Sequence, residues 1–127
     1  MASILITEND PLIGADLCAF LIREGQEAQC VLDCPETMRC LSSCPPLEVS
    51  ILDPQGQEMA SCVELMVALV RLSIPVIVWT LIPNAECLSE LKALNLPLVV
   101  FAPGVPYKDI LVAIFQNTPQ PDPTKPN

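Results

Sequence analysis

Short apolar runs alternate with helix-like stretches along this chain of 127 residues. The runs are rich in β-branched residues and have the length of buried strands; they cover residues 3–7, 27–32, 48–54, 74–80 and 96–101. Stretches with a helical spacing of apolar residues follow each run, at 11–24, 35–43, 58–72, 84–94 and 107–116. Strands that alternate with helices pair in parallel through right-handed crossovers. The pattern predicts a doubly wound α/β fold, a (βα)5 parallel sheet with helices on both faces.

Polar and turn-forming residues set the limits of these elements. Asp10 suits the N-cap of the first helix, Pro11 its first position, and Gly25 its end. Residues 1–117 are predicted to form one domain. The remaining stretch, 118–127, carries four prolines and no apolar anchor, so we expect it to be disordered.

The hydrophobic fraction of 51% fits a sheet that is covered on both faces, because its strands are apolar throughout. No apolar run approaches the roughly 20 residues that a membrane-spanning helix needs, so we expect no membrane association. The first ten residues, MASILITEND, lack the basic stretch of a secretory signal. A cytoplasmic location is therefore expected.

The charge and the cysteines narrow the choice of partners and metals. Six basic and fifteen acidic residues give a formal net charge of −9, so we expect no nucleic-acid partner, since no basic patch could neutralise phosphates. Seven cysteines without a secretory signal favour reduced thiols. Cys30, Cys34, Cys40 and Cys44 lie close in sequence, but zinc sites usually use tighter CxxC pairs or histidine, and this chain has no histidine. We expect these thiols to act as small apolar side chains.

Polar residues stand at the carboxyl ends of three predicted strands. Glu8 follows the first strand, Asp53 ends the third and Thr80 ends the fourth. Ligands of an open parallel sheet gather at this edge, which makes Asp53 the first candidate for chemistry. The alternative is that Asp53 only opens a turn, since Asp-Pro-Gln-Gly is also typical of turns.

The order and spacing of these motifs resemble the receiver domain of bacterial two-component response regulators, over about residues 3–116. ILITENDPLI is similar to the first strand and acidic cluster of that family, VSILDP to its phosphoacceptor strand, and IPVIVWT to its hydroxyl-bearing strand. The resemblance implies the strand order 2-1-3-4-5, which general accounts of doubly wound folds illustrate with a member of this family. A flavodoxin-like cofactor carrier is disfavoured, because no phosphate-binding loop follows the first strand.

The resemblance also assigns roles to residues. Asp53 would accept a phosphoryl group, and Thr80 would hydrogen-bond to it. Mg²⁺ would be held by Glu8, Asn9, Asp53 and the backbone carbonyl of Gln55, offsetting the charge of the carboxylates and the phosphoryl group. The protein would then be a signalling module of a phosphorelay and not an enzyme, with a histidine kinase or phosphotransfer protein as its donor.

Several positions depart from the family pattern. Asn9 replaces the second of two adjacent acids, and Ala102 stands where the family has a lysine that pairs with the phosphoryl oxygens. Leu81 replaces a very small residue, Val99 the aromatic switch residue, and Pro54 stiffens the loop after Asp53. Two interpretations stay open: a phosphorylated response regulator, and a pseudo-receiver that is never phosphorylated and binds partners constitutively.

The resemblance makes two further predictions. The peptide bond between Ala102 and Pro103 is expected to be cis, as at the matching position of the family. The output partner, or a second copy in a homodimer, is expected to bind the face of the fourth helix, fifth strand and fifth helix. The residues predicted for this surface are Leu88, Leu91, Val100, Tyr107, Ile110 and Leu111.

Overall fold

The computed structural model of the chain describes residues 3–43, 46–81 and 85–118, and it contains a five-stranded parallel sheet with the order β2-β1-β3-β4-β5. The strands are β1 (Ser3–Thr7), β2 (Glu27–Val31), β3 (Val49–Leu52), β4 (Val76–Val78) and β5 (Leu98–Val100). The helices are α1 (Pro11–Arg23), α2 (Cys34–Ser43), α3 (Met59–Arg71), α4 (Ala85–Ala93) and α5 (Tyr107–Asn117). The predicted fold class and strand order are confirmed.

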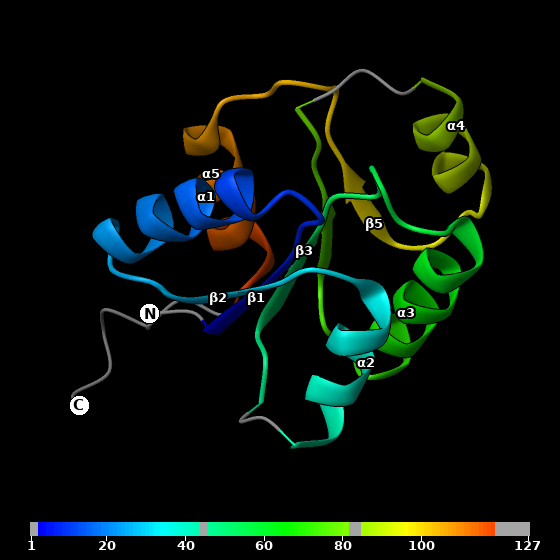
Figure 1. The fold of residues 1–127 in the computed structure, drawn as a ribbon, viewed down its shortest axis with the longest axis horizontal. Coiled ribbons are helices and arrows are strands. Elements are labelled where there is room, and N and C mark those ends of the chain that lie inside the picture. Colours follow the sequence, from blue (N-terminus) through cyan, green and yellow to red (C-terminus); the bar gives the residue numbers. More distant parts are fainter. Residues whose placement is uncertain (1–2, 44–45, 82–84, 119–127) are drawn as a thin grey trace.

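The helices cover the sheet in two layers, with α1 and α5 on one face and α2, α3 and α4 on the other (Figure 1). Each layer has its own hydrophobic core. One core packs Ile6, Ile51 and Trp79 against α1 and α5. The other packs Leu52 and Val78 against α2, α3 and α4. Because β1, β3 and β4 lie inside the sheet, both faces of these strands are buried, which explains why their sequences are apolar at nearly every position.

Three details differ from expectation. β4 and β5 are shorter than predicted, at Val76–Val78 and Leu98–Val100. The Ala102–Pro103 bond is trans, so the predicted cis bond is wrong. Thr118, the first residue of the predicted tail, is buried and donates its hydroxyl to the Ile114 carbonyl at 2.8 Å. Residues 119–127 lie outside the described part of the chain.

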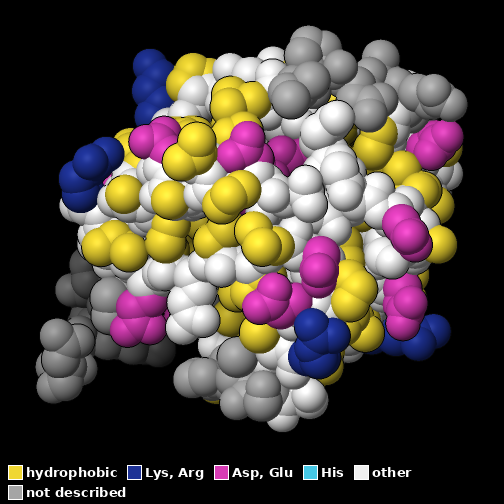
Figure 2. Space-filling view, in the orientation of Figure 1, with side chains coloured by type: hydrophobic (Ala, Val, Ile, Leu, Met, Phe, Trp, Pro, Cys, Tyr) yellow, Lys and Arg dark blue, Asp and Glu magenta, His cyan; other side chains and the backbone are white. Residues whose placement is uncertain are grey.

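The outer face of α1 is unusually apolar. Leu12 is 81% exposed and Ile22 54% exposed, and Ala15 and Ala19 lie between them at helical spacing. Figure 2 shows hydrophobic side chains gathered where α1 faces the viewer. Within residues 3–43, 46–81 and 85–118, no helix has the length and hydropathy needed to cross a bilayer.

Gly14 allows α1 to lie close against the sheet. A Cβ atom at this position would overlap the Cys30 Sγ atom and would stand 3.5 Å from the Cβ of Glu8. A methyl group here therefore collides with Cys30, although alanine favours helix over glycine by about 1 kcal/mol.

We expect Gly14→Ala to change the free energy of unfolding in opposite directions in two backgrounds. In the wild type, overpacking against Cys30 should outweigh the helix propensity and destabilise the fold by about 1 kcal/mol or more. In Cys30→Ala, where the sulfur is gone, the same change should stabilise by up to about 1 kcal/mol. Urea denaturation of the four proteins measures both effects, and equal effects in the two backgrounds would show that Cys30 is not the obstacle.

Candidate functional site

The pairing of β1 with β3 brings Glu8 and Asp53 together. Thr7 is in register with Leu52, and each acid follows its strand by one residue. The ladder continues into the site, because the Asp53 N–H donates to the Thr7 carbonyl and the Glu8 N–H donates to the Val31 carbonyl, both at 2.9 Å. The backbone of two neighbouring strands thus fixes the position of both carboxyl groups.

Both carboxyl groups are buried and hydrogen-bonded to each other. Glu8 is 2% exposed and Asp53 is 4% exposed. Burial, followed by the hydrogen bond to Asp53 and the charges of Asp53 and Asp10, raises the pKa of Glu8 to about 9. Glu8 is therefore protonated at neutral pH and shares its proton with Asp53, which is the usual way for two adjacent acids to avoid repulsion.

Glu8, Asn9, Asp53 and Gln55 line one cavity of about 200 Å³, together with Asp10, Ile13 and Gly56. The structure thus brings together all four residues that were predicted to surround Mg²⁺. The Glu8 Oε2 atom is buried there without a hydrogen-bond partner. An unsatisfied carboxyl oxygen beside further oxygen donors fits a hard divalent cation, which prefers such ligands.

The loop after Asp53 shapes this cavity. The Gln55 N–H donates to the Asp53 Oδ1 atom at 2.8 Å, and the Gln57 N–H donates to the Pro54 carbonyl at 3.1 Å. Gly56 has a positive φ of 78°, and a Cβ atom there would lie 2.7 Å from the Asn9 Oδ1 atom. Only glycine combines this backbone conformation with so close an approach. The Asp-Pro-Gln-Gly sequence therefore forms a turn and also builds the site, so the two interpretations of Asp53 are compatible.

Asp10 lines the cavity and is also the N-cap residue of α1. Its Oδ1 atom accepts the Leu12 N–H at 2.9 Å and caps α1, as predicted. Among the described residues, no group of three or more histidine, cysteine or acidic side chains is arranged to hold a metal ion. A cation at this site would therefore depend on the two carboxyl groups of Glu8 and Asp53 and on amide or carbonyl oxygens.

Thr80 lies at the same edge of the sheet but outside the lining of the cavity. It is 1% exposed and follows β4 by two residues, while its carbonyl accepts the Gly104 N–H at 2.8 Å. Because Val78 is in register with Val100, Ala102 stands beside Thr80 on the neighbouring strand path. Ala102 is exposed and carries no charge. No lysine or arginine lines the part of the cavity that the structure describes.

The predicted interaction surface is wrong at three positions. Leu91 and Ile110 are completely buried and Leu88 is 6% exposed, since all three belong to the cores beneath α4 and α5. Helix periodicity alone could not tell which stripe of these short helices faces the sheet. The other three predicted residues, Val100, Tyr107 and Leu111, are half-buried.

Tyr107 takes part in contacts within the molecule. Its ring lies 5.5 Å from the rings of Phe20 and Trp79, and its hydroxyl donates to the Asp16 Oδ2 atom at 2.8 Å. Burial, followed by that hydrogen bond, raises the pKa of Tyr107 to about 12. The indole N–H of Trp79 donates to the Val105 carbonyl at 2.8 Å. Tyr107 therefore connects the start of α5 with α1 and with the residue that follows β4, through ring contacts and a hydrogen bond.

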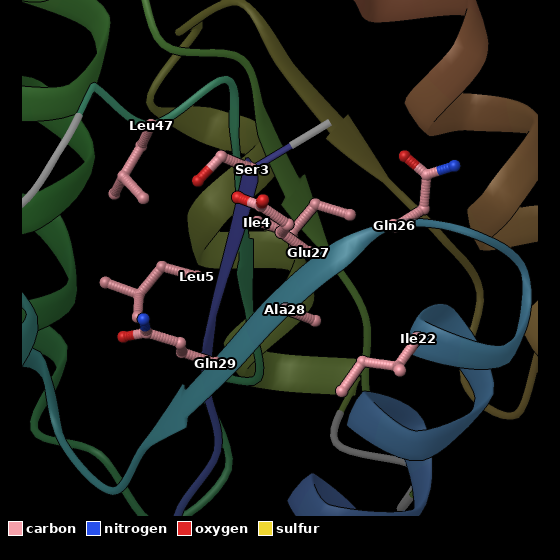
Figure 3. A pocket seen from close by; sticks show the side chains of 9 residues that line it. All are labelled: Ser3, Ile4, Leu5, Ile22, Gln26, Glu27, Ala28, Gln29 and Leu47. Atoms are coloured by element: carbon pink, nitrogen blue, oxygen red, sulfur yellow. The ribbon is translucent and has the colours of Figure 1, made fainter. Parts of the chain in front are cut away.

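A larger cavity of about 400 Å³ lies along β2, at the other end of the strands (Figure 3). Side chains from both faces of the sheet line it, among them Leu5, Ile22 and Gln29. None of the predicted site residues reaches it. The four predicted Mg²⁺ ligands thus lie at the smaller cavity.

The protonated Glu8 makes the stability of the fold depend on pH. Its pKa rises from 4.5 in the unfolded chain to about 9 on folding, so the resulting stabilisation is complete below pH 4.5 and is lost as the pH rises toward 9. The free energy of unfolding can fall by about 1.4 kcal/mol per pH unit in this range. Glu8→Gln does not titrate, so it should be more stable than the wild type at pH 8 and similar to it at pH 5.

Urea denaturation at pH 5, 6.5 and 8 measures this difference. The matched control is Glu64→Gln, which alters an exposed glutamate on α3 and should keep the slope of the wild type. Parallel pH profiles for the wild type and Glu8→Gln would contradict a shared proton between Glu8 and Asp53.

Comparison with known proteins yields solved structures only: no protein-family model and no curated protein sequence matches the chain. The receiver domain of a histidine kinase from Syntrophus aciditrophicus matches with a TM-score of 0.70 and 22% identity, covering 91% of this chain and 89% of the other. The chemotaxis protein CheY4 from Vibrio cholerae matches with a TM-score of 0.73 and 19% identity, over 92% and 98% of the two chains.

A third neighbour is the receiver domain of a sensor histidine kinase from Pseudomonas aeruginosa, with a TM-score of 0.72 and 17% identity over 91% of this chain and 96% of the other. That structure has a magnesium ion coordinated in its active-site cleft. The neighbours include receiver domains of histidine kinases and of a response regulator. Over about nine tenths of its length, this chain has the receiver fold.

Proposed function

We propose that this protein is a receiver that accepts a phosphoryl group on Asp53 and signals through contacts with other proteins. The observation that carries the proposal is the buried Glu8–Asp53 pair at the carboxyl edge of the sheet, in which the Glu8 Oε2 atom has no hydrogen-bond partner. The receiver fold of the neighbours supports it, because this edge is where a doubly wound sheet binds ligands.

In the proposed reaction, a carboxylate oxygen of Asp53 attacks the phosphorus of a phosphohistidine on a histidine kinase or phosphotransfer protein. An acyl phosphate forms as the bond from phosphorus to the donor nitrogen breaks. Glu8 has to release the shared proton, so that Asp53 is available as a nucleophile. Thr80 stands at the same edge and would donate its hydroxyl to the phosphoryl group.

Glu8, Asn9, Asp53 and Gln55 would hold a Mg²⁺ ion in the cavity of about 200 Å³. When bound, the ion would offset the negative charge that two carboxylates and a phosphoryl group bring together. The chain's own residues supply few other means of doing so, since Ala102 replaces the expected lysine. We therefore expect weak metal binding and a short-lived phosphorylated state.

A pseudo-receiver is the second candidate, and the same pair of acids favours it. A proton between Glu8 and Asp53 offsets the negative charge of the two carboxyl groups without a metal ion. The exposed Ala102 offers no cation for a phosphoryl group. In this alternative, the protein binds partners constitutively. Either way, the output partner or a second copy would contact the exposed surface around β5 and α5, where Val100 and Leu111 are half-buried.

Phosphorylation separates the two candidates. After incubation with acetyl phosphate and Mg²⁺, intact mass spectrometry should show one added phosphoryl group on the wild type and none on Asp53→Asn. Ala102→Lys should raise the phosphorylated fraction or its lifetime by about tenfold or more, because charge-assisted hydrogen bonds contribute about 1.5–3 kcal/mol. A wild type that stays unmodified while Ala102→Lys is modified would support the pseudo-receiver.

Magnesium binding should depend on pH. An ion must displace the proton shared by Glu8 and Asp53, so Mg²⁺ affinity, measured by calorimetric titration, should rise between pH 6 and pH 8. Glu8→Gln should weaken binding about tenfold. Glu64→Gln is the matched control, because it removes an exposed acid on α3 outside the cavity and should leave the affinity unchanged. Equal affinity at both pH values would argue against an ion between the two carboxyl groups.

A further inference from the structure

Cys34 and Cys62 form a buried pair that the sequence pattern does not suggest. The two residues stand 28 positions apart, yet their sulfur atoms lie 3.8 Å from each other, and both side chains are fully buried. Sequence spacing grouped Cys34 with Cys30 and Cys40, whereas the fold places it against Cys62. The two sulfurs are in van der Waals contact, so a bond needs only about 1.8 Å of further approach.

The pair joins the beginnings of two helices. Cys34 is the first residue of α2, and Cys62 lies in the first turn of α3. Cys34 itself is fully buried, while its chain neighbours Asp33 and Pro35 are exposed, so the first turn of α2 begins at the surface. Opening the first turn of α2 would therefore give a small molecule access to the sulfur without unfolding the sheet.

We propose that Cys34 and Cys62 are a redox-responsive pair, which a peroxide converts into a reversible disulfide that ties α2 to α3. This inference does not depend on phosphorylation of Asp53. In a reducing compartment both thiols would be free, and the bridge would form only during oxidative exposure, as is usual for intracellular regulatory disulfides.

The chemistry balances with hydrogen peroxide as the oxidant. The Cys34 thiolate attacks one peroxide oxygen, the O–O bond breaks, and Cys34 sulfenic acid forms with release of hydroxide. The Cys62 sulfur then attacks the Cys34 sulfur and loses its proton. The sulfenic oxygen leaves as water. Two thiols are oxidised and one peroxide is reduced to two waters, and a thiol reductant reverses the bridge.

Local chemistry makes Cys34 the attacking thiol. The Cys34 S–H group donates to the Cys62 sulfur at 3.8 Å, and the hydrogen bond between the two thiols lowers the pKa of Cys34, while the amino end of α2 also favours a thiolate. The other partner of that hydrogen bond, Cys62, has a raised pKa. Burial raises the pKa of Cys30 to about 11 and raises that of Cys18. Cys30 and Cys18 therefore remain protonated and react more slowly.

A bridge would also act on the candidate functional site. The Cys34 N–H donates to the Gln57 side-chain oxygen at 3.2 Å, and the Gln57 amide nitrogen donates to the Leu32 carbonyl at 2.9 Å. Gln57 follows the turn that begins at Asp53, and the chain from Asp53 to Cys62 lies inside the bridged loop. Joining α2 to α3 should therefore restrain the loop that lines the acidic cavity.

The test is oxidation of the full chain in the Cys30→Ser background with hydrogen peroxide. Cleavage after glutamate places Cys62 in residues 59–64 and Cys34 in residues 28–36, while Cys40 and Cys44 remain together in 37–48. We expect a linked pair of fragments 28–36 and 59–64 as the main product. The intact protein should lose about 2 Da reversibly, and its Tm should rise by roughly 10 °C.

Two single variants serve as controls. Cys62→Ser should leave Cys34 as a sulfenic acid that a dimedone probe captures, and it should abolish the Tm rise. Cys87→Ser alters another half-buried cysteine near the same core, and it should behave like the Cys30→Ser background. Each variant's Tm in reductant confirms that it is folded.

Three results would overturn the proposal. They are linkage of 28–36 to 37–48 as the main product, oxidation of other thiols first, and no linkage at peroxide concentrations that oxidise free cysteine. Amide hydrogen exchange adds an independent readout, because residues 55–58 should exchange at least several-fold more slowly in the bridged form than in the reduced form. Unchanged exchange there would refute the link to the functional site.

Discussion

Two carboxyl groups that share a proton inside a parallel sheet are the constraint on which the rest of this site depends. β1 and β3 place Glu8 and Asp53 side by side, and their burial removes the water that would otherwise solvate a negative charge. A proton or a cation can offset the negative charge of the pair, whereas two ionised carboxylates without either would repel each other strongly there. Gly14, Gly56 and the cap formed by Asp10 all serve to hold the surrounding chain close to this pair.

The fold could be predicted from the sequence because local signals agreed with one another. The apolar strands, Asp10 before Pro11, and Gly25 after α1 each favoured the same limits for the same elements. The strand order came from the resemblance and not from periodicity, which contains no information on which strands are neighbours. The short β4 and β5 were overestimated, since apolar residues continue beyond the last paired residue.

The acidic site was predicted in part. Glu8 and Asp53 were found because strand ends converge, a rule that needs only topology, whereas Asn9 and Gln55 came from the resemblance. The trans bond before Pro103, the burial of Leu91 and Ile110, and the contact between Cys34 and Cys62 depend on how particular side chains pack in three dimensions. The Gly56 contact with Asn9 had a visible signal, a glycine three residues after the acid.

The apolar outer face of α1 gives the acidic composition of the chain a physical role. Leu12 and Ile22 are exposed to water on this face. Exposed apolar surface favours association between molecules that collide. A net charge of −9 makes every copy repel every other. Colloidal stability is therefore an electrostatic property of this protein, and it weakens with ionic strength, since the screening length falls from about 10 Å at 0.1 M salt to about 3 Å at 1 M.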